Sequence, residues 1–390
     1  MATEFDRDDV YTMIGMGQVS KTLGNTLYGL NNQPQIGEAL SANQLQQGMA
    51  FFTRPQLNLT SKNIRNSREL LNLITNKKES ISRYIRCSLD PRLAKLGEIT
   101  GEVTLDGAGK PTKNYTKIST PLVQENQAFI PVLSNRLTTL TGWPDRVFPS
   151  FTSEEGLYKQ VYSQIDGSAR IYGKVELNAT FADLQGSPIL RMMDIWGLYS
   201  TLVFEGIIAP YPDFWVEDEI DYNVRIFRIL LNTTGNKVAM IASSGPGFID
   251  SIGIGSTFDF NRSAQILDQG EDVTVKFAVH GITYNDPVLL LEFNQTVEIH
   301  QPGMKDANRD QEMEKINPNV LRYFNYAGYP RINLNTLEFE HWIEIEKAKE
   351  IKERFLEFTD GKLTYNNYQE ENTVEGDGIY TGRPIYSGDI

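Results

Sequence analysis

The strongest cluster of side chains able to do acid–base chemistry is the acidic run Glu217, Asp218, Glu219 and Asp221. Two carboxylates can perform acid–base work on a glycosidic bond, and several together can hold calcium. The spacing of a calcium-binding loop is missing, however, and the run leads directly into an alternating segment, Tyr222–Leu231. The pattern therefore favours a charged start to a strand, which could face an aqueous channel, over a catalytic pair.

The histidines do not form a recognisable site. They are His280, His300 and His341. None of the close spacings used by metal sites occurs among them, and the sequence has no Gly-x-Ser-x-Gly nucleophile motif. His280 falls on the polar phase of an alternating segment, so we expect it to be solvated.

Cys87 is the only cysteine, so it cannot form an internal disulfide. Arg83 and Arg86 precede it and could lower the pKa of its thiol, but we interpret it as an inert thiol of the core or the surface. The glycine-rich segments 244–247 and 253–255 lack the lysine of a phosphate-binding loop and are interpreted as turns. The sequence therefore predicts no catalytic, cofactor-binding or metal-binding residue, and no cofactor.

The composition is that of a folded protein with a sizeable core. The chain has 390 residues, of which 40% are hydrophobic and 11% aromatic, so it could form two or three domains and cannot be wholly disordered. No apolar run approaches the roughly 20 residues of a membrane-spanning helix, and the acidic start, Met1–Asp9, does not resemble a secretory signal. We therefore expect a protein that is made and assembled in a cytosol and does not insert into membranes.

The charge is negative but unevenly distributed. The formal net charge is −13, whereas a protein that binds nucleic acid through phosphates needs the opposite sign. Residues 51–100 are nevertheless basic, and the residues from 301 onward are acidic. Two interpretations stay open: these ends could meet in neighbouring copies of one subunit, or both could be solvated faces.

Residues 163–281 carry the clearest structural pattern. From residue 171 to residue 181, apolar and polar residues alternate as in a strand with one buried and one solvated face. The apolar set is Ile171, Val175, Leu177, Ala179 and Phe181, and the polar set is Tyr172, Lys174, Glu176, Asn178 and Thr180. Further strand patterns lie at Val224–Leu231, Val238–Ala242 and Val273–Val279.

A helix is predicted after the first of these strands. Ser187 can cap its start with Pro188 in the first turn, and Gly206 can end it. Its apolar residues include Ile189, Met192, Trp196, Tyr199 and Val203. One helix against a strongly alternating sheet, without a reactive cluster, indicates a component of an assembly.

Three further structured segments are predicted outside this region. Asn66–Tyr84 has a helix-like pattern, and residues 97–120 have the pattern of a hairpin. Asn335, with Glu338 three residues later, could cap a helix over Leu337–Phe358.

The two ends of the chain and two tryptophans point to contacts with partners. Residues 1–50 and 361–390 have the composition of arms that become ordered only on a partner. Trp143 and Trp215 lie in proline-containing loops and could either plug the local core or anchor an interface. We favour the core for Trp143.

The order of these elements over Phe51–Pro287 resembles the tail-tube proteins of bacteriophages and related contractile injection systems. The resemblance rests on Arg54-Pro55-Gln56-Leu57 as the opening, the amphipathic strand from Asp166-Gly167 to Phe181, the helix Ser187–Trp196 with its Asp194-Ile195-Trp196 end, and the closing strand Val273–Gly281. It implies a mainly β fold with α elements: a tail-tube-like β-sandwich or barrel with one packed helix, an insertion, and extended N- and C-terminal arms.

The resemblance also implies a function and partners. Subunits of that family form six-fold rings whose sheets join into one β-barrel around a lumen through which DNA passes, and the lumen is typically acidic. The implied partners are therefore copies of this chain in a cyclic ring, expected to be a hexamer, and other tail, baseplate or neck proteins. DNA would be met only in passage, without specific binding. The implied location is the virion, assembled in the bacterial cytoplasm.

The expected organisation is an N-terminal arm over residues 1–50, a tail-tube-like domain over 51–295 with an insertion at about 61–160, and a helical and extended region over 296–390. The insertion and the last region depart from a plain tube subunit. A specialised ring therefore fits better, either a tube initiator in the baseplate or a terminator or neck ring.

Other functions stay open at this point. One is another capsid, neck or fibre-adaptor part. Another is a tail-associated glycan hydrolase that uses the acidic run, and a third is a carbohydrate-binding β-protein that uses Trp143 and Trp215.

Overall fold

The computed structural model describes residues 48–358, except 76, 97, 106–110, 117, 119, 121, 218, 233–234, 259–271, 322–323 and 325–326. Two compact units are distinguished: unit 1 runs to Pro302 and also includes Ile332–Phe339, and unit 2 comprises Gly303–Arg331 and the chain from Glu340 onward. The N-terminal arm predicted over residues 1–50 lies outside the described residues up to residue 47, and residues 48–50 belong to strand β1 (Gly48–Phe52). The arm predicted over residues 361–390 also lies outside the described residues. Among the described residues, no helix combines the length and the apolar character needed to cross a membrane.

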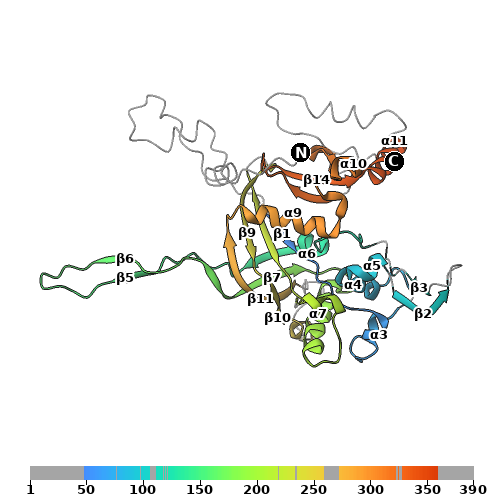
Figure 1. Cartoon of the computed structure of the whole chain (residues 1–390), viewed down its shortest axis with the longest axis horizontal. Helices are drawn as coiled ribbons and strands as arrows, with labels where there is room; N and C mark the ends of the chain where they lie inside the picture. The colour runs from blue at the N-terminus through green and yellow to red at the C-terminus, as the bar shows by residue number, and fades with distance from the viewer. Residues whose placement is uncertain are drawn as a thin grey trace, which may run out of the picture. The chain divides into compact units, whose positions relative to one another are not determined.

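A seven-stranded antiparallel β-sheet forms the centre of unit 1 (Figure 1). Its strands follow the order β1-β8-β9-β11-β7-β4. Strand β10 also pairs with β11, at residues preceding those that pair with β9. The strands are β1 (Gly48–Phe52), β4 (Leu137–Thr141), β7 (Ile171–Ala182), β8 (Ile226–Leu231), β9 (Val238–Ser244), β10 (Gly247–Ile252) and β11 (Asp272–Tyr284). All the pairs are antiparallel. The strands predicted around residues 171–181, 224–231, 238–242 and 273–279 are therefore confirmed.

The long pair β7 and β11 shows the predicted alternation. Leu177, Ala179 and Phe181 are fully buried, whereas the residues between them are only partly buried. Gly281 interrupts β11 with a shift of register and has a φ of +77°, a conformation that favours glycine. A Cβ at this position would stand 2.8 Å from the carbonyl oxygen of Ile171, so the close approach of the two strands also requires glycine.

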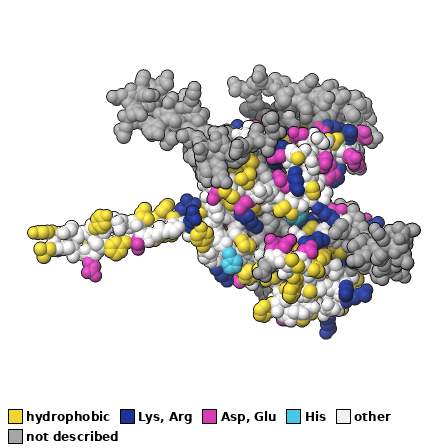
Figure 2. Space-filling view, viewed as in Figure 1, with side chains coloured by type: hydrophobic (Ala, Val, Ile, Leu, Met, Phe, Trp, Pro, Cys, Tyr) yellow, Lys and Arg dark blue, Asp and Glu magenta, His cyan; other side chains and the backbone are white. Residues whose placement is uncertain are grey.

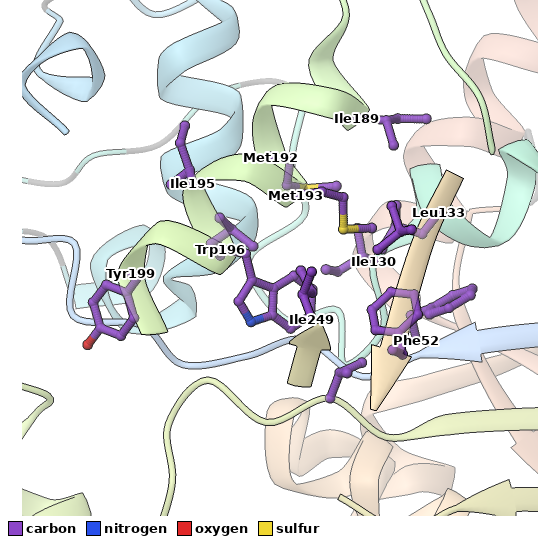
Figure 3. Packing of buried hydrophobic residues seen from close by; sticks show 14 of the residues in the cluster. Phe52, Ile130, Leu133, Ile189, Met192, Met193, Ile195, Trp196, Tyr199 and Ile249 are labelled. Atoms are coloured by element: carbon purple, nitrogen blue, oxygen red, sulfur yellow. The ribbon is translucent and has the colours of Figure 1, made fainter. Parts of the chain in front are cut away.

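The predicted helix is α7 (Pro188–Phe204), which packs on one face of the sheet (Figure 3). Its buried residues join Phe52 of β1 and Ile249 of β10 in one continuous core. Trp196 and Tyr199 are among the largest fully buried side chains, and the Trp196 indole Nε1 donates to the Tyr222 carbonyl at 2.8 Å. Burying side chains of this size contributes roughly 1.5–3 kcal/mol each, so this core is what holds the sheet and helix together.

The start of α7 differs from the prediction in one respect. Ser187 is the N-cap residue, but it adopts a left-handed conformation and its side chain makes no capping hydrogen bond. The Asp183 carboxylate instead accepts hydrogen bonds from the Ile189 and Leu190 amides at 3.0 and 3.2 Å. A carboxylate near the first turn also interacts favourably with the helix dipole. The helix ends as predicted, with Gly206 at a φ of +74°.

The opposite face of the sheet is covered only in part. Phe293 of α9 (Val288–His300) stacks on Phe129 at a centroid distance of 5.1 Å and meets Phe227 of β8 edge-on at 5.5 Å. Register places Phe51 opposite Phe227 on this face. The remaining part of the face, over β7, β10 and β11, carries mostly polar residues, with Ala278 and Phe248 opposite each other among them.

The other elements of unit 1 are short. They are α3 (Ser61–Ile64), η1 (Leu71–Leu73), α4 (Ile81–Leu89), α5 (Pro91–Leu96), α6 (Pro131–Arg136), α8 (Pro212–Glu217), η2 (Gly255–Phe258), and the hairpins β2 (Glu98–Leu105) with β3 (Pro111–Thr116) and β5 (Ser150–Thr152) with β6 (Ser163–Ile165). The predicted hairpin over residues 97–120 is thus confirmed, with its turn outside the described residues.

The helix predicted over Asn66–Tyr84 is wrong. Only the short turn η1 and the first residues of α4 fall within it. Leu70 and Leu73 are buried as expected, but the segment also contains several Asn, Ser and Thr residues, whose side chains compete for backbone hydrogen bonds and disfavour a continuous helix.

Unit 2 consists of a small sheet with helices. Its elements are η4 (Pro302–Met304), α10 (Arg309–Glu312), β12 (Met313–Ile316), η5 (Pro318–Val320), β13 (Tyr329–Ile332), β14 (Phe339–Glu344) and α11 (Ile345–Phe358), with the strand order β12-β14-β13. The helix predicted over Leu337–Phe358 is therefore wrong in its first third, which is strand β14. Pairing with the remote strand β12 overrides the helical spacing of Phe339, Trp342 and Ile343.

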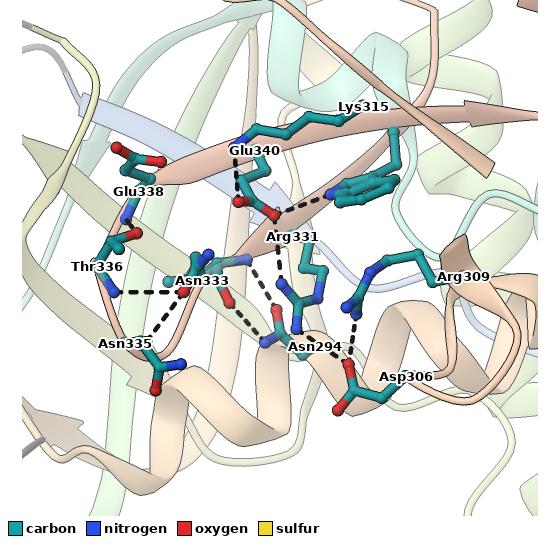
Figure 4. Close-up of polar contacts among 12 residues, drawn as sticks. Asn294, Asp306, Arg309, Lys315, Arg331, Asn333, Asn335, Thr336, Glu338 and Glu340 are labelled. Atoms are coloured by element: carbon teal, nitrogen blue, oxygen red, sulfur yellow. Dashed lines mark hydrogen bonds and ion pairs between the residues drawn. The ribbon is translucent and has the colours of Figure 1, made fainter. Parts of the chain in front are cut away.

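A buried carboxylate organises this small sheet (Figure 4). Glu340 is almost fully buried, and its oxygens accept from Lys315 Nζ at 2.8 Å, Arg331 Nη1 at 3.2 Å and Trp342 Nε1 at 2.9 Å. Arg331 also pairs with Asp306 at 3.1 Å. Part of the acidic charge after residue 301 is thus neutralised inside unit 2 and is not a solvated face.

Candidate assembly interface

The open polar face of the sheet is defined by one row of side chains on each of β7 and β11. The row on β7 is Tyr172, Lys174, Glu176, Asn178 and Thr180, and the row on β11 is Asp272, Thr274, Lys276, Ala278 and His280. Register places Lys174 opposite His280 and Glu176 opposite Ala278. His280 is exposed, as predicted.

Charges on the open polar face are paired. Glu176 lies between two lysines, with its carboxylate oxygens 3.8 Å from Lys174 Nζ and 3.2 Å from Lys276 Nζ. Asp250, at a bulge of β10, lies 3.7 Å from Lys174 Nζ. The two lysines, Lys174 and Lys276, thus share this side of the sheet with three carboxylates, those of Glu176, Asp250 and Asp272. The open polar face is therefore nearly neutral in spite of the chain's net charge of −13.

Both strands that border this face have a free edge among the described residues. Strand β4 pairs with β7 alone, and β10 pairs along its length with β11 alone, apart from a bridge between Val224 and Gly247. Unpaired edges of this kind can accept a strand from another chain. The β4–β7–β11–β10 side of the sheet is thus bounded by two edges able to continue it.

A two-stranded arm leaves the sheet between β4 and β7 and ends in β5 and β6 (Figure 1). Hydrophobic side chains run along it to its tip (Figure 2). At the tip, Leu157 is 91% exposed and Tyr158 is 85% exposed. The other exposed apolar residues of the arm are Val147, Phe148, Phe151, Val161, Tyr162 and Ile165. Such a concentration of exposed apolar side chains marks an interaction surface.

The arm was not predicted from the sequence. Its strands are only three residues each and every residue in them is exposed, so no buried face produces a periodic pattern. The signal available was a pair of short β-branched and aromatic stretches on either side of Glu154-Glu155-Gly156.

The acidic run does not form a site. Glu217 ends α8 and is exposed, Glu219 is also exposed, and Asp218 lies outside the described residues. Asp221 instead points inward, where it accepts a 2.5 Å hydrogen bond from the Tyr199 hydroxyl and burial raises its pKa to about 6. The predicted charged start to a strand facing a channel is therefore wrong for Asp221, which is buried, whereas Glu217 and Glu219 are exposed.

Two basic residues of the segment 51–100 are structural. Arg54 is almost fully buried; its Nε donates to the Ser88 carbonyl at 2.7 Å and its Nη2 to the Cys87 carbonyl. Arg86 Nε donates to the Leu59 carbonyl at 2.7 Å. The arginine of the Arg54-Pro55 opening thus ties the C-terminal turn of α4 to the start of the domain, a role that sequence reasoning missed because burial is not visible in composition.

The other candidate groups are structural as well. Burial raises the pKa of the Cys87 thiol to about 11, against the opposing effect of Arg83, so the expectation of an inert thiol fits. Burial lowers the pKa of His300 to about 4. Within the described residues, no group of His, Cys, Asp and Glu is arranged to hold a metal.

The two tryptophans have different surroundings. Trp143 is partly buried, packs against the main core, and lies 6.2 Å from the ring of Tyr284, as favoured. Trp215 is 71% exposed on α8. Trp215 therefore belongs to the surface.

Comparison with known proteins finds one matching family and several solved structures with weak similarity. Residues 3–355 match the model of a family described as "Putative phage tail tube protein". No curated protein matches the chain. Among solved structures, the tube-terminating cap of the anti-feeding prophage matches with 10% identity and a TM-score of 0.25, over 40% of this chain and 81% of that one. The PVC sheath/tube terminator, from an extracellular contractile injection system, matches with 9% identity and a TM-score of 0.23, over 40% of this chain and 86% of that one.

Proposed function

The chain belongs to the phage tail tube protein family, and on this premise we propose that it forms a closed ring around a DNA channel in the tail of a phage particle. The open polar face would line the channel, and neighbouring copies would complete the wall. The proposed partners are copies of the same chain, six to a ring, together with adjoining tail proteins.

The observation that carries this proposal is the pair of free edges on β4 and β10. Strands β4, β7, β11 and β10 are successively antiparallel, so β4 runs opposite to β10. Copies related by rotation keep their strand directions, and β4 of one copy would therefore meet β10 of the next as an antiparallel pair. Closing a ring in this way pairs the free edges of both β4 and β10.

The arm supports contacts beyond the ring wall. Leu157 and Tyr158 are too exposed to contribute to folding of a single copy, so their burial would come from a neighbour in the assembled tail. Tyr is favoured as an anchor residue in interfaces.

The position of the ring in the tail is a separate question. The family match extends to residue 355, so much of the region after Thr296 belongs to the family pattern. This differs from the interpretation that the region departs from a plain tube subunit. We propose a ring of the tube, of its initiator in the baseplate, or of its terminator at the neck, within the virion.

Engineered cysteines test the ring directly. Thr139→Cys on β4 and Ser251→Cys on β10 lie on opposite edges, three strand spacings apart, or about 14 Å, too far for a disulfide within one chain. Oxidation of the double variant is expected to give a ladder of covalent oligomers that ends at six copies. Thr141→Cys with Ser251→Cys samples a second register.

Controls separate this result from random crosslinking. Each single variant can form at most a dimer through its new cysteine, because Cys87 is buried. If both double variants remain monomeric under oxidation while the protein assembles, β4 and β10 do not meet and the proposed wall is wrong.

A further inference from the structure

Lysines on a surface that DNA passes would be expected to slow it. The open polar face carries Lys174 on β7 and Lys276 on β11. Each lysine bound to a phosphate releases condensed counterions, which is the main source of nonspecific affinity for DNA. The two lysines therefore need an explanation if the face lines a DNA channel, and the inference below rests on that proposed function.

The positions of the neighbouring carboxylates supply this explanation for Lys174 and Lys276. Glu176 bridges both lysines, and Asp250 holds Lys174 from the other side of β11. All four side chains are partly exposed, with Lys174 and Glu176 about half exposed. Exposed ion pairs of this kind add only about 0–1 kcal/mol to stability, so folding does not require them.

We propose that Glu176 and Asp250 neutralise Lys174 and Lys276, so that the open polar face does not retain a DNA duplex. A phosphate that approached either lysine would have to displace a carboxylate that is already in place. Glu176 is the more important of the two because it contacts both lysines. The face thus avoids binding DNA by pairing its cations and not by lacking them.

The test is the double variant Glu176→Gln with Asp250→Asn in the full-length chain. Its binding to a short fluorescein-labelled DNA duplex is measured by fluorescence anisotropy over a series of NaCl concentrations. If two lysines are freed, the slope of the logarithm of the association constant against the logarithm of the salt concentration should be steeper by about 1.8 than for the unmodified protein. Each tenfold dilution of salt should therefore strengthen DNA binding by the variant about 60-fold more than it strengthens binding by the unmodified protein.

Two controls identify the cause of any gain. Glu154→Gln with Glu155→Gln makes the same change in net charge on the arm and is expected to leave DNA binding unchanged. Adding Lys174→Gln and Lys276→Gln to the test variant is expected to abolish the gain.

The inference would be overturned if the correctly folded test variant bound DNA no better than the unmodified protein. An equal gain in DNA affinity in the arm control would also overturn it. So would a salt dependence of DNA binding that is already as steep in the unmodified protein. Circular dichroism and the melting temperature report folding. Failure of the disulfide ladder with a positive DNA result would remove the channel but leave the charge pairing, so the two proposals fail separately.

Discussion

Arg54 provides the sharpest test of how the tube-like domain is held together. Its Nη1 donates to the carbonyls of Glu125 and Gln127 at 3.1 and 3.2 Å, and its Nε and Nη2 donate to the last turn of α4. One planar guanidinium thus joins two segments that are remote in the sequence. We predict that Arg54→Met destabilises unit 1 and that Arg54→Lys does not rescue it.

The magnitude follows from the buried contacts. Hydrogen bonds to charged groups contribute about 1.5–3 kcal/mol each, so losing the two buried bonds to Ser88 and Cys87 predicts a loss of about 3–6 kcal/mol. A lysine keeps the charge in a site where burial already lowers the pKa of Arg54 to about 10, but its single ammonium cannot reproduce the fork. Arg54→Lys should therefore be at least as unstable as Arg54→Met.

Urea unfolding followed by circular dichroism and tryptophan fluorescence measures the effect, with the slope of the transition compared between variants. Arg65→Met is the matched control because Arg65 is exposed, and it should change stability by less than about 0.5 kcal/mol. Arg54→Lys with the stability of the unmodified protein would refute the reasoning, since charge alone would then suffice.

Three other predictions concern a buried acid, the arm and the thiol. Burial raises the pKa of Asp221 from 3.8 to about 6, so the stability it contributes is present at low pH and is lost as the pH rises through about 6. Relative to Asp221→Asn, the unmodified protein should gain about 2 kcal/mol between pH 7.5 and pH 4 in urea titrations, and a constant difference would contradict this. Leu157→Ser with Tyr158→Ser should leave the melting temperature of the free subunit unchanged but weaken assembly measured by light scattering; unchanged assembly would show that the arm tip makes no important contact. Cys87 is buried and its pKa is raised to about 11, so it should react with a thiol reagent only after unfolding, and rapid labelling of the native protein at pH 8 would contradict its burial.

Much of the sheet and its helix could be predicted from local pattern. The strand β7 alternates because one of its faces is buried against α7 and the other is open, so its period of two appears directly in the sequence. Helix α7 is recognisable because Pro188 and Gly206 mark its ends.

The features that escaped prediction depend on contacts between remote residues. Glu340 lies in the segment predicted as a helix over Leu337–Phe358, but it is buried in strand β14, where it pairs with Lys315 and Arg331. No local rule favours a strand there. The β5–β6 arm has no buried face. The pairing of Glu176 with Lys276 requires two strands about a hundred residues apart to be in register.

The central claim is that copies of this chain close into a ring. Electron microscopy of the purified full-length protein, with its mass measured by light scattering, tests that claim most directly. The account predicts rings of six subunits with a central hole, in which β4 of each copy lies beside β10 of the next. Closed assemblies in which these two strands face solvent, or open filaments without a hole, would contradict it.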